Sequence, residues 1–240
     1  MAKKDVFIKY REMVHGLAPY ASQGHGGELH PESLKDIMDV VKRTSPKNIL
    51  EMGFFRGNSA LMWLLASTAC VHSIDIFVNK NNHVLNKDDS VNILRYEKAN
   101  RPDAMISIEY LMTQFPNRFI FELLNSFNIL VQKETEWFNK FDLIFIDANH
   151  GPGAVMEDTK SSITLMAKYI LYDDYCKYGY MQSIIKNNPR LKIIKVYSPI
   201  KECEGNNGQC LVEVLPIKNK SRGISLIEAL LISNKSYGEK

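Results

Sequence analysis

Residues 48–65 read NILEMGFFRGNSALMWLL: a short apolar run, a turn with two glycines, and a second apolar run. The first run, 48–52, has the length of a buried strand, and the second, 60–65, can form a buried helix. Gly53 and Gly57 permit the tight turn that closes a strand onto the helix after it. The stretch therefore predicts a strand, turn and helix, the repeating unit of an α/β sheet.

Short apolar runs continue after this unit and alternate with segments that can be helical. We predict seven strands, at 48–52, 71–76, 118–123, 141–147, 169–174, 191–198 and 210–217. The last two runs have no strong helical pattern between them and are joined by a Gly- and Asn-rich segment, which favours a closing antiparallel hairpin. The predicted fold class is α/β: a Rossmann-like, seven-stranded, mostly parallel sheet with an antiparallel C-terminal hairpin and helices on both faces.

Three regions follow from the pattern. Residues 1–45 are predicted to form an N-terminal helical layer or lid, residues 46–217 the core, and residues 218–240 a C-terminal tail. Within the core, the polar stretch 79–100 is rich in Asn and Lys and predicts an exposed insertion or lid.

Composition excludes several classes of protein. The 240 residues carry 30 Lys and Arg against 27 Asp and Glu, a net charge of +3, and 45% are hydrophobic, which indicates one globular domain. The basic residues are scattered, so we expect no nucleic-acid partner. The first residues lack the apolar core of a secretory signal, and no stretch approaches the length of a membrane span, so we expect a cytoplasmic protein without a membrane partner.

The four cysteines are Cys70, Cys176, Cys203 and Cys210, and none forms a C-x-x-C pair. Reduced thiols are the expectation. Cys203 and Cys210 flank the segment between the last two strands and could meet across the hairpin as a disulfide or zinc site.

The glycine turn indicates which cofactor the fold would hold. A dinucleotide fingerprint counted from Gly53 needs glycine at positions 55 and 58, where this chain has Phe55 and Asn58, which argues against NAD or FAD. The pattern Glu-x-Gly-x-x-x-Gly-x-Ser over 51–59 instead resembles the first motif of class I S-adenosylmethionine (SAM) methyltransferases. This resemblance implies a SAM site with backbone close to the ligand at the two glycines, and it implies that Glu51, Gly53, Gly57 and Ser59 contact the cofactor. The alternative is a turn that only closes a strand onto its helix.

Polar residues after the next strands extend this site. Asp75 ends the second predicted strand, where open α/β folds place an acidic residue that accepts hydrogen bonds from ribose hydroxyls. Asn125 and Ser126 follow the third, where similar methyltransferases carry a polar pair near adenine. Alternatively, the pair is a cap or a turn.

Carboxylates end the fourth and fifth predicted strands, at Asp147, Asp173 and Asp174. The carboxyl ends of neighbouring parallel strands line one crevice, so these three side chains are expected to converge there. They would repel one another unless a cation joined them, and such hard oxygen ligands suit Mg²⁺, with Mn²⁺ or Ca²⁺ as substitutes. A helix N-cap or a solvated turn is the alternative for Asp173 and Asp174.

The residue patterns at the ends of these two strands carry a closer resemblance. Phe-Ile-Asp-x-x-His at 145–150, followed by Asp-Asp-Tyr at 173–175, is similar to metal-dependent small-molecule O-methyltransferases of the macrocin, mycinamicin and novobiocin type, and more distantly to catechol and caffeoyl-CoA O-methyltransferases. The resemblance implies that Asp147, Asp173 and Asp174 hold the metal, that Asp147 also lies at the cofactor, and that His150 is the general base.

Two departures from that family bear on these roles. Some relatives have an acidic residue two positions after the first metal Asp, where this chain has Asn149, so the base assignment rests on His150 alone. His150 could otherwise be an ordinary loop residue. Relatives usually enter the later strand through Gly-Gly, and this chain has Ala167-Lys168.

The expected function is a Mg²⁺- and SAM-dependent O-methyltransferase of natural-product biosynthesis that methylates a hydroxyl of a sugar, polyketide or phenol, as a monomer or a homo-oligomer. A cephalosporin-hydroxylase-like enzyme on the same fold and a non-catalytic SAM- or metabolite-binding module are the alternatives. Aromatic residues that could line the substrate pocket, or equally lie in the core or on the surface, are Tyr20, Tyr172, Tyr175, Tyr178 and Tyr180.

Overall fold

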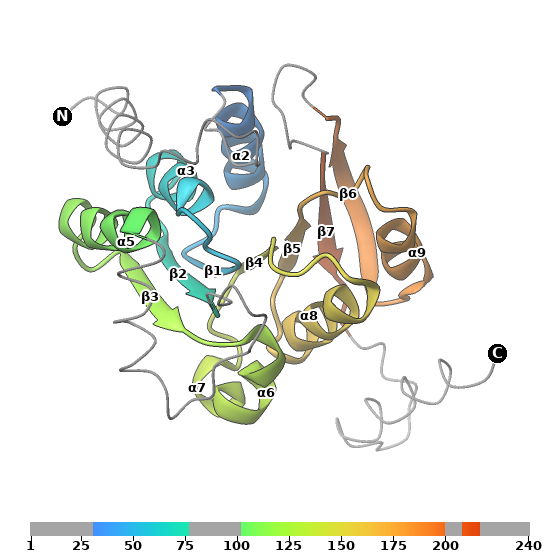
Figure 1. Ribbon diagram of the computed structural model, residues 1–240. Coiled ribbons are helices and arrows are strands. Elements are labelled where there is room, and N and C mark those ends of the chain that lie inside the picture. Colours follow the sequence, from blue (N-terminus) through green and yellow to red (C-terminus); the bar gives the residue numbers. More distant parts are fainter. Residues whose placement is uncertain (1–30, 77–101, 200–207, 217–240) are drawn as a thin grey trace.

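The computed structural model describes residues 31–76, 102–199 and 208–216, and they build one seven-stranded sheet (Figure 1). The strand order is β3-β2-β1-β4-β5-β7-β6. Strands β1 to β5 pair in parallel, whereas β7 is antiparallel to both β5 and β6. The predicted fold class and all seven strands are confirmed, with bounds β1 Asn48–Met52, β2 Cys70–Asp75, β3 Phe119–Leu123, β4 Leu143–Ile146, β5 Tyr169–Tyr172, β6 Leu191–Tyr197 and β7 Gln209–Val214.

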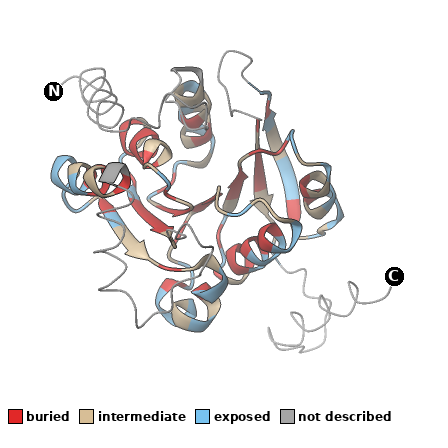
Figure 2. Ribbon diagram, in the orientation of Figure 1, coloured by how far each residue is buried: buried red, intermediate tan, exposed pale blue. Residues whose placement is uncertain are grey.

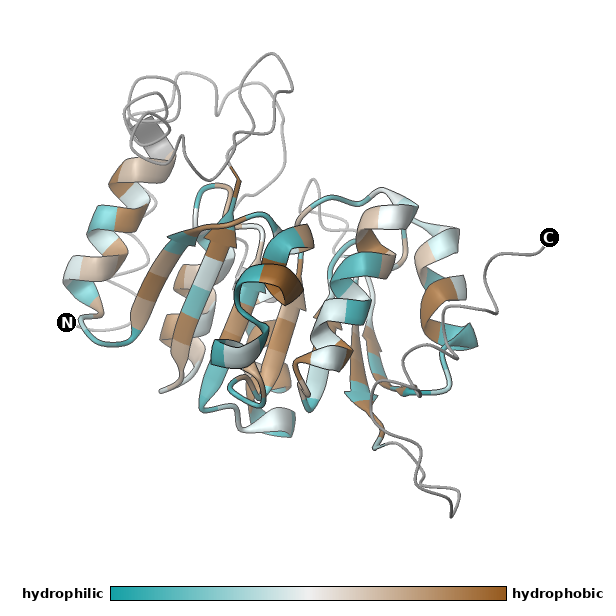
Figure 3. Ribbon diagram, turned by 90° about the horizontal axis from the view of Figure 1, so that it is seen from below, coloured by the Kyte–Doolittle hydropathy of each residue, from teal (hydrophilic) through white to brown (hydrophobic). Residues whose placement is uncertain are grey.

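Helices cover both faces of the sheet. One layer contains α2 (Pro31–Thr44), α3 (Asn58–Ala66) and α5 (Pro102–Gln114), which pack on one hydrophobic core. The opposite layer packs on a second core and comprises η3 (Ser126–Asn128), α6 (Ile129–Gln132), α7 (Glu134–Trp137), α8 (Pro152–Thr164) and α9 (Gly179–Asn187). In Figures 2 and 3 the buried and hydrophobic residues concentrate on the strands and on the inner sides of these helices.

Alternation along β1 explains how one strand serves both cores. Ile49 packs in the core beneath α2, α3 and α5, whereas Leu50 and Met52 pack in the other. Side chains of successive strand residues point to opposite faces, so a strand covered on both faces is apolar at nearly every position. Glu51 breaks this apolar run while fully buried, and it is therefore the residue of β1 that needs another explanation.

Several predictions concern residues outside the described ranges: the insertion at 79–100, the tail at 218–240, Tyr20, Cys203 and most of the N-terminal layer. The described part of that layer contains α2, which runs from Pro31 to Thr44. Cys70, Cys176 and Cys210 are free thiols. Among the described helices, none combines the length and the apolar character that a membrane crossing requires.

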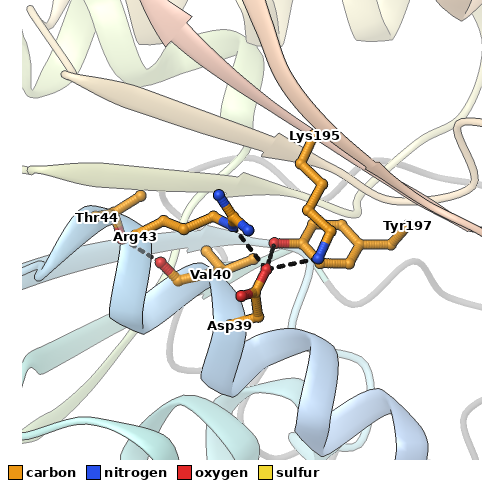
Figure 4. A network of polar contacts seen from close by, with 6 residues as sticks. All are labelled: Asp39, Val40, Arg43, Thr44, Lys195 and Tyr197. Carbon is orange, nitrogen blue, oxygen red and sulfur yellow. Dashed lines mark hydrogen bonds and ion pairs between the residues drawn. The ribbon is translucent and has the colours of Figure 1, made fainter.

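A polar network ties α2 to the edge strand β6 (Figure 4). Asp39 Oδ2 accepts hydrogen bonds from Arg43 Nε at 2.7 Å, from Lys195 Nζ at 2.8 Å and from Tyr197 Oη at 2.9 Å. The bonds from Arg43 and Lys195 are the main reasons why the pKa of Asp39 lies far below its usual value. The network joins residues that are 156 and 158 positions apart, so it fixes the helix before β1 against the last part of the sheet.

We expect Asp39→Asn to destabilise the protein at pH 7 by about 1 kcal/mol, a value kept small because water screens this partly exposed network, and so to lower the melting temperature by about 3 °C. The pKa of Asp39 is lower in the folded than in the unfolded chain, so its contribution is present above pH 4 and is lost as the pH falls further. Melting curves at pH 7 and pH 3 measure this: the difference between variant and wild type should shrink at pH 3. Lys42→Gln on the same helix is the control, and an equal loss at both pH values would contradict the expectation.

Candidate active site

The candidate site lies where the strand order of the sheet reverses, at the carboxyl ends of β1 and β4. From this pair the chain order runs outward through β2 and β3 on one side and through β5 on the other. Open α/β sheets bind ligands in the crevice at such a switch point. Two backbone bonds continue the pairing past the strand ends, from Gly53 N to Ile74 O and from Asp147 N to Met52 O, both at 2.9 Å.

Gly53 is required by the protein's own backbone. Its φ of +99° lies in the left-handed region, and a Cβ atom at this position would overlap the backbone carbonyl of Asp147. Any larger residue would therefore both strain the turn and push β4 away from β1. The glycine that the motif places near the ligand thus first allows the two central strand ends to meet.

Asp75 shapes the glycine turn from the end of β2. Its Oδ2 accepts hydrogen bonds from the backbone N–H groups of Phe54 and Phe55, at 2.9 and 2.8 Å. Phe55 is held at φ +48° and Gly57, the residue before α3, at φ +74°. Bonds from Asp75 to two successive amides hold the turn in this conformation, which gives the predicted ribose-binding residue a structural role as well.

Glu51 lies beneath the turn and is fully buried. Ser73 Oγ donates to its Oε2 at 2.5 Å, while its buried Oε1 has no hydrogen-bond partner. Burial raises the pKa of Glu51 to about 7; hydrogen bonds from Ser59 and Ser73 work against this, and the charge of Asp75 adds to it. Native proteins rarely leave a buried acceptor unpaired, so Oε1 marks a place for a ligand donor.

The predicted pair after β3 has one clear role. Asn125 Oδ1 accepts a hydrogen bond from Phe127 N at 3.0 Å and so caps η3, as the alternative interpretation of the pair expected. Ser126 lies near Asp158 of α8, where its hydroxyl lowers a carboxyl pKa that burial raises to about 6. Asp158 is fully buried and neither oxygen meets hydrogen-bond geometry, a feature that the sequence did not single out.

The predicted carboxylates do converge. Asp147 follows β4, Asp173 and Asp174 follow β5, and the Asp173 N–H donates to Ile146 O at 3.1 Å. His150 Nε2 lies 3.5 Å from Asp147 Oδ1 and 3.7 Å from Asp174 Oδ2. The three acids and the predicted base therefore share one group at the ends of β4 and β5.

Burial and mutual repulsion act on these acids. The Asp147 side chain keeps 30% of its surface exposed, yet burial still raises its pKa well above the usual value, and the neighbouring Asp173, Glu51 and Asp174 raise it further. Burial likewise raises the pKa of Asp173 to about 6, although a hydrogen bond from Gln209 counteracts this. A hydrogen bond between Asp147 and Asp173 also contributes, raising the pKa of Asp147 and lowering that of Asp173.

The donor set can be compared with the metal that the family resemblance implies. Hard carboxylate oxygens held together at the cost of raised pKa values fit a divalent cation such as Mg²⁺. In the part of the chain that the structure describes, however, no group of three or more His, Cys, Asp and Glu side chains is arranged to hold one. Asp147 and Asp173 lie together, while Asp174 faces His150 and Lys177 Nζ, each at 3.7 Å.

Aromatic rings form the wall beside His150. Tyr178 stacks on the imidazole with a centroid distance of 5.7 Å and an interplanar angle of 22°, and Tyr180 lies 5.3 Å from Tyr178. Burial lowers the pKa of His150, against the opposing charge of Asp174, and so favours the neutral ring. Of the five candidate pocket tyrosines, four lie among the described residues, and two of these four, Tyr172 and Tyr175, are buried in the core.

Two residues of this group were missed by the sequence analysis. Gln209 Nε2 donates to Asp173 Oδ1 at 2.9 Å, and Lys177 pairs with Asp174. Lys177 follows Asp174 by three residues, so their ion pair could have been suspected from the spacing. Gln209 lies 36 residues from Asp173, and only the pairing of Tyr172 with Cys210 across β5 and β7 brings it there.

Comparison with known proteins places the fold. No protein-family model and no curated protein matches the chain. Solved structures do match. A Podospora anserina methyltransferase with S-adenosylhomocysteine (SAH) bound has a TM-score of 0.56 at 15% identity, over 88% of each chain. An O-methyltransferase from Bacillus cereus in complex with SAH has a TM-score of 0.55 at 18% identity, over 86% of this chain and 90% of that one. A methyltransferase from Geobacter sulfurreducens has a TM-score of 0.55 at 10% identity, over 87% and 89%. At these identities the likeness shows the fold alone: the chain has the Rossmann-like fold of these methyltransferases.

We expect Gly53→Ala to destabilise the protein by about 2–4 kcal/mol, because a positive φ and a backbone overlap add up at this position. Gly153→Ala in α8 is the matched control: nothing lies within 4 Å of its Cβ position. In a helix this control change should be neutral or stabilising by up to about 1 kcal/mol. Denaturant unfolding of both variants measures the difference, and similar values for the two would contradict the role assigned to Gly53.

Proposed function

We propose that the protein is a SAM-dependent O-methyltransferase that acts on a hydroxyl group of a small molecule. The observation that carries the proposal is Glu51: a buried carboxylate with an unpaired oxygen, directly beneath the glycine turn and near Asp75. SAM offers an ammonium group for such an oxygen. Proteins with SAH bound share the fold, which supports the same choice of cofactor.

Each predicted cofactor contact then has a distinct task. Glu51 binds the ammonium group, and Ser59 and Ser73 hold its carboxylate in place. The backbone at Gly53 and Gly57 approaches the ligand without a side chain between them. Asp75 accepts from the ribose hydroxyls, and Asn125 and Ser126 flank the adenine.

His150 is the candidate general base of the transfer. Its lowered pKa leaves the imidazole neutral near pH 7, so Nε2 can accept the proton of the acceptor hydroxyl. When bound, SAM would supply the sulfonium methyl carbon that the deprotonated oxygen attacks, and its sulfur would keep the electron pair of the broken C–S bond. The products are a methyl ether and S-adenosylhomocysteine, with the proton on His150. Stacking against Tyr178 holds the imidazole in position for this step.

A divalent ion is part of the proposal. Asp147, Asp173 and Asp174 would hold it, and when bound it would lower the pKa of the acceptor hydroxyl. The raised pKa values of Asp147 and Asp173 support this, because a cation relieves their repulsion. Fixed placement of cofactor and acceptor in one crevice would supply the rest of the rate enhancement.

The first test is calorimetric titration with S-adenosylhomocysteine (SAH) between pH 6 and pH 8. The pKa of Glu51 is about 7, so its ionised fraction rises over this range, and we expect SAH affinity to rise about tenfold from pH 6 to pH 8. Glu51→Gln should bind SAH more weakly at pH 8 and with little dependence on pH.

The same variant should raise the melting temperature of the ligand-free protein at pH 8, because folding raises the pKa of Glu51 to about 7. Its burial therefore costs stability increasingly as the pH rises from the unfolded-state pKa to the folded-state pKa, and this cost is complete at pH 8. Glu157→Gln, on the exposed side of α8, is the control. No SAH binding by the wild type at any pH would exclude the proposed cofactor.

We expect His150→Ala to lower kcat by about 100- to 10,000-fold, the usual contribution of a general base, with SAH affinity unchanged. Formation of SAH from SAM is measured with phenol, sugar and polyketide acceptors. EDTA and Asp147→Ala should each reduce turnover. Methyl transfer that is indifferent to both would remove the metal from the proposal, and SAH binding without turnover on any acceptor would favour a binding module.

A further inference from the structure

Asp158 is a buried acid that the proposed methyl transfer does not use. It lies in α8, which packs against η3, and it is fully buried. Within the described ranges, neither of its carboxylate oxygens has a hydrogen bond of proper geometry. Native structures rarely leave buried oxygens unpaired, so a hydrogen-bond donor belongs beside this carboxylate.

Ser126 of η3 is the donor within reach. Burial raises the pKa of Asp158 to about 6, and the Ser126 hydroxyl counteracts this. Two hydroxyls of α8 itself are engaged elsewhere: Thr159 Oγ1 donates to Val155 O at 2.6 Å, and Ser162 Oγ donates to the backbone carbonyl of Asp158 at 2.7 Å. The Ser126 hydroxyl turns about a single bond, so a small rotation would align it with the carboxylate.

The carboxylate of Asp158 decides how the Ser126 hydroxyl is oriented. An ionised carboxylate only accepts hydrogen bonds, whereas a serine hydroxyl has one proton to donate and two lone pairs. If the proton points to Asp158, Ser126 offers a ligand its lone pairs alone. Asp158 is sealed from any ligand, while Ser126 is half-buried, so Asp158 can act on a ligand only through Ser126. Asn125, the other residue of the predicted pair, uses its Oδ1 to cap η3.

We infer that Asp158 is a positioning residue that makes Ser126 a hydrogen-bond acceptor for the amino group of the adenine base of SAM. This inference rests on the proposed function, from which it takes the cofactor and the place of Ser126 beside the adenine. It gives the site a preference between bases. Adenine presents an amino group to the acceptor, whereas hypoxanthine presents a carbonyl oxygen in the same place, which would leave two acceptors facing each other.

Calorimetric titration at pH 8 with SAH and with S-inosylhomocysteine, in which hypoxanthine replaces adenine, measures this preference as the ratio of two Kd values. We expect the wild type to bind SAH at least about tenfold more tightly, because the analogue leaves acceptors unpaired. In Asp158→Asn the new amide can donate to Ser126 Oγ and frees the serine proton, so the ratio should fall to about threefold or less. Ser126→Ala removes the acceptor and should lower the ratio equally. Lys160→Gln, on the exposed side of α8, is the control and should keep the wild-type ratio.

The ratio separates a positioning residue from a merely structural one. Asp158→Asn keeps the size of the side chain and removes a charge whose burial is unfavourable, so the variant should fold, as its melting curve will show. If Asp158 only supported the packing of α8 on η3, the variant would weaken both ligands together and leave the ratio unchanged.

An unchanged ratio in Asp158→Asn or in Ser126→Ala would overturn the inference while leaving the proposed cofactor standing. Equal affinity of the wild type for SAH and S-inosylhomocysteine would do the same. Ser126→Ala decides the matter alone should Asp158→Asn not fold. A wild type that binds neither ligand would overturn the inference and the proposed cofactor together.

Discussion

Two central strands can meet at their carboxyl ends only because Gly53 has no side chain. A Cβ there would occupy the place of the Asp147 carbonyl, so the contact between the end of β1 and the end of β4 depends on one missing carbon atom. Gly53, on one side of this contact, begins the turn that leads to α3. Asp147, on the other side, is one of the candidate metal ligands. The candidate cofactor site at the glycine turn and the candidate metal site at Asp147 are thus neighbours at this backbone contact.

Acidic side chains gather around that boundary at a cost to stability. Glu51, Asp147 and Asp173 all have raised pKa values, and burial is the largest cause in each case. A carboxyl whose pKa is raised by folding destabilises the folded chain as the pH rises above its unfolded-state pKa, and this cost is complete once the pH exceeds the folded-state pKa. The two hydrophobic cores offset this cost, and cationic ligands would recover it: an ammonium group at Glu51, a divalent ion at the acidic pair. Unfavourable burial in the free protein is therefore a source of affinity.

The sequence predicted what depends on strand pattern and parallel order. Apolar runs located all seven strands, and because neighbouring parallel strands end at one edge, Asp147 and Asp173 could be placed together. Contacts that depend on antiparallel strand pairing or on the packing of one helix against another could not be predicted from the sequence. The bond from Gln209 to Asp173 depends on the register of β7 against β5, and the unpaired carboxyl of Asp158 depends on how α8 packs against η3. Asp75 was placed correctly, but its bonds to the glycine turn follow from backbone conformations that no pattern reveals.

The hairpin and α2 connect the two halves of the site by a second route. Strand β7 carries Gln209 to Asp173, β6 pairs with β7, and Lys195 and Tyr197 on β6 bind Asp39 of α2. Helix α2 in turn packs on α3, which begins at the glycine turn. The glycine turn and the acidic pair are therefore held directly, by β1 against β4, and also around the outside of the sheet. The proposed methyl transfer would require donor and acceptor at a fixed separation, and two independent connections between their candidate sites reduce the freedom of that separation to vary.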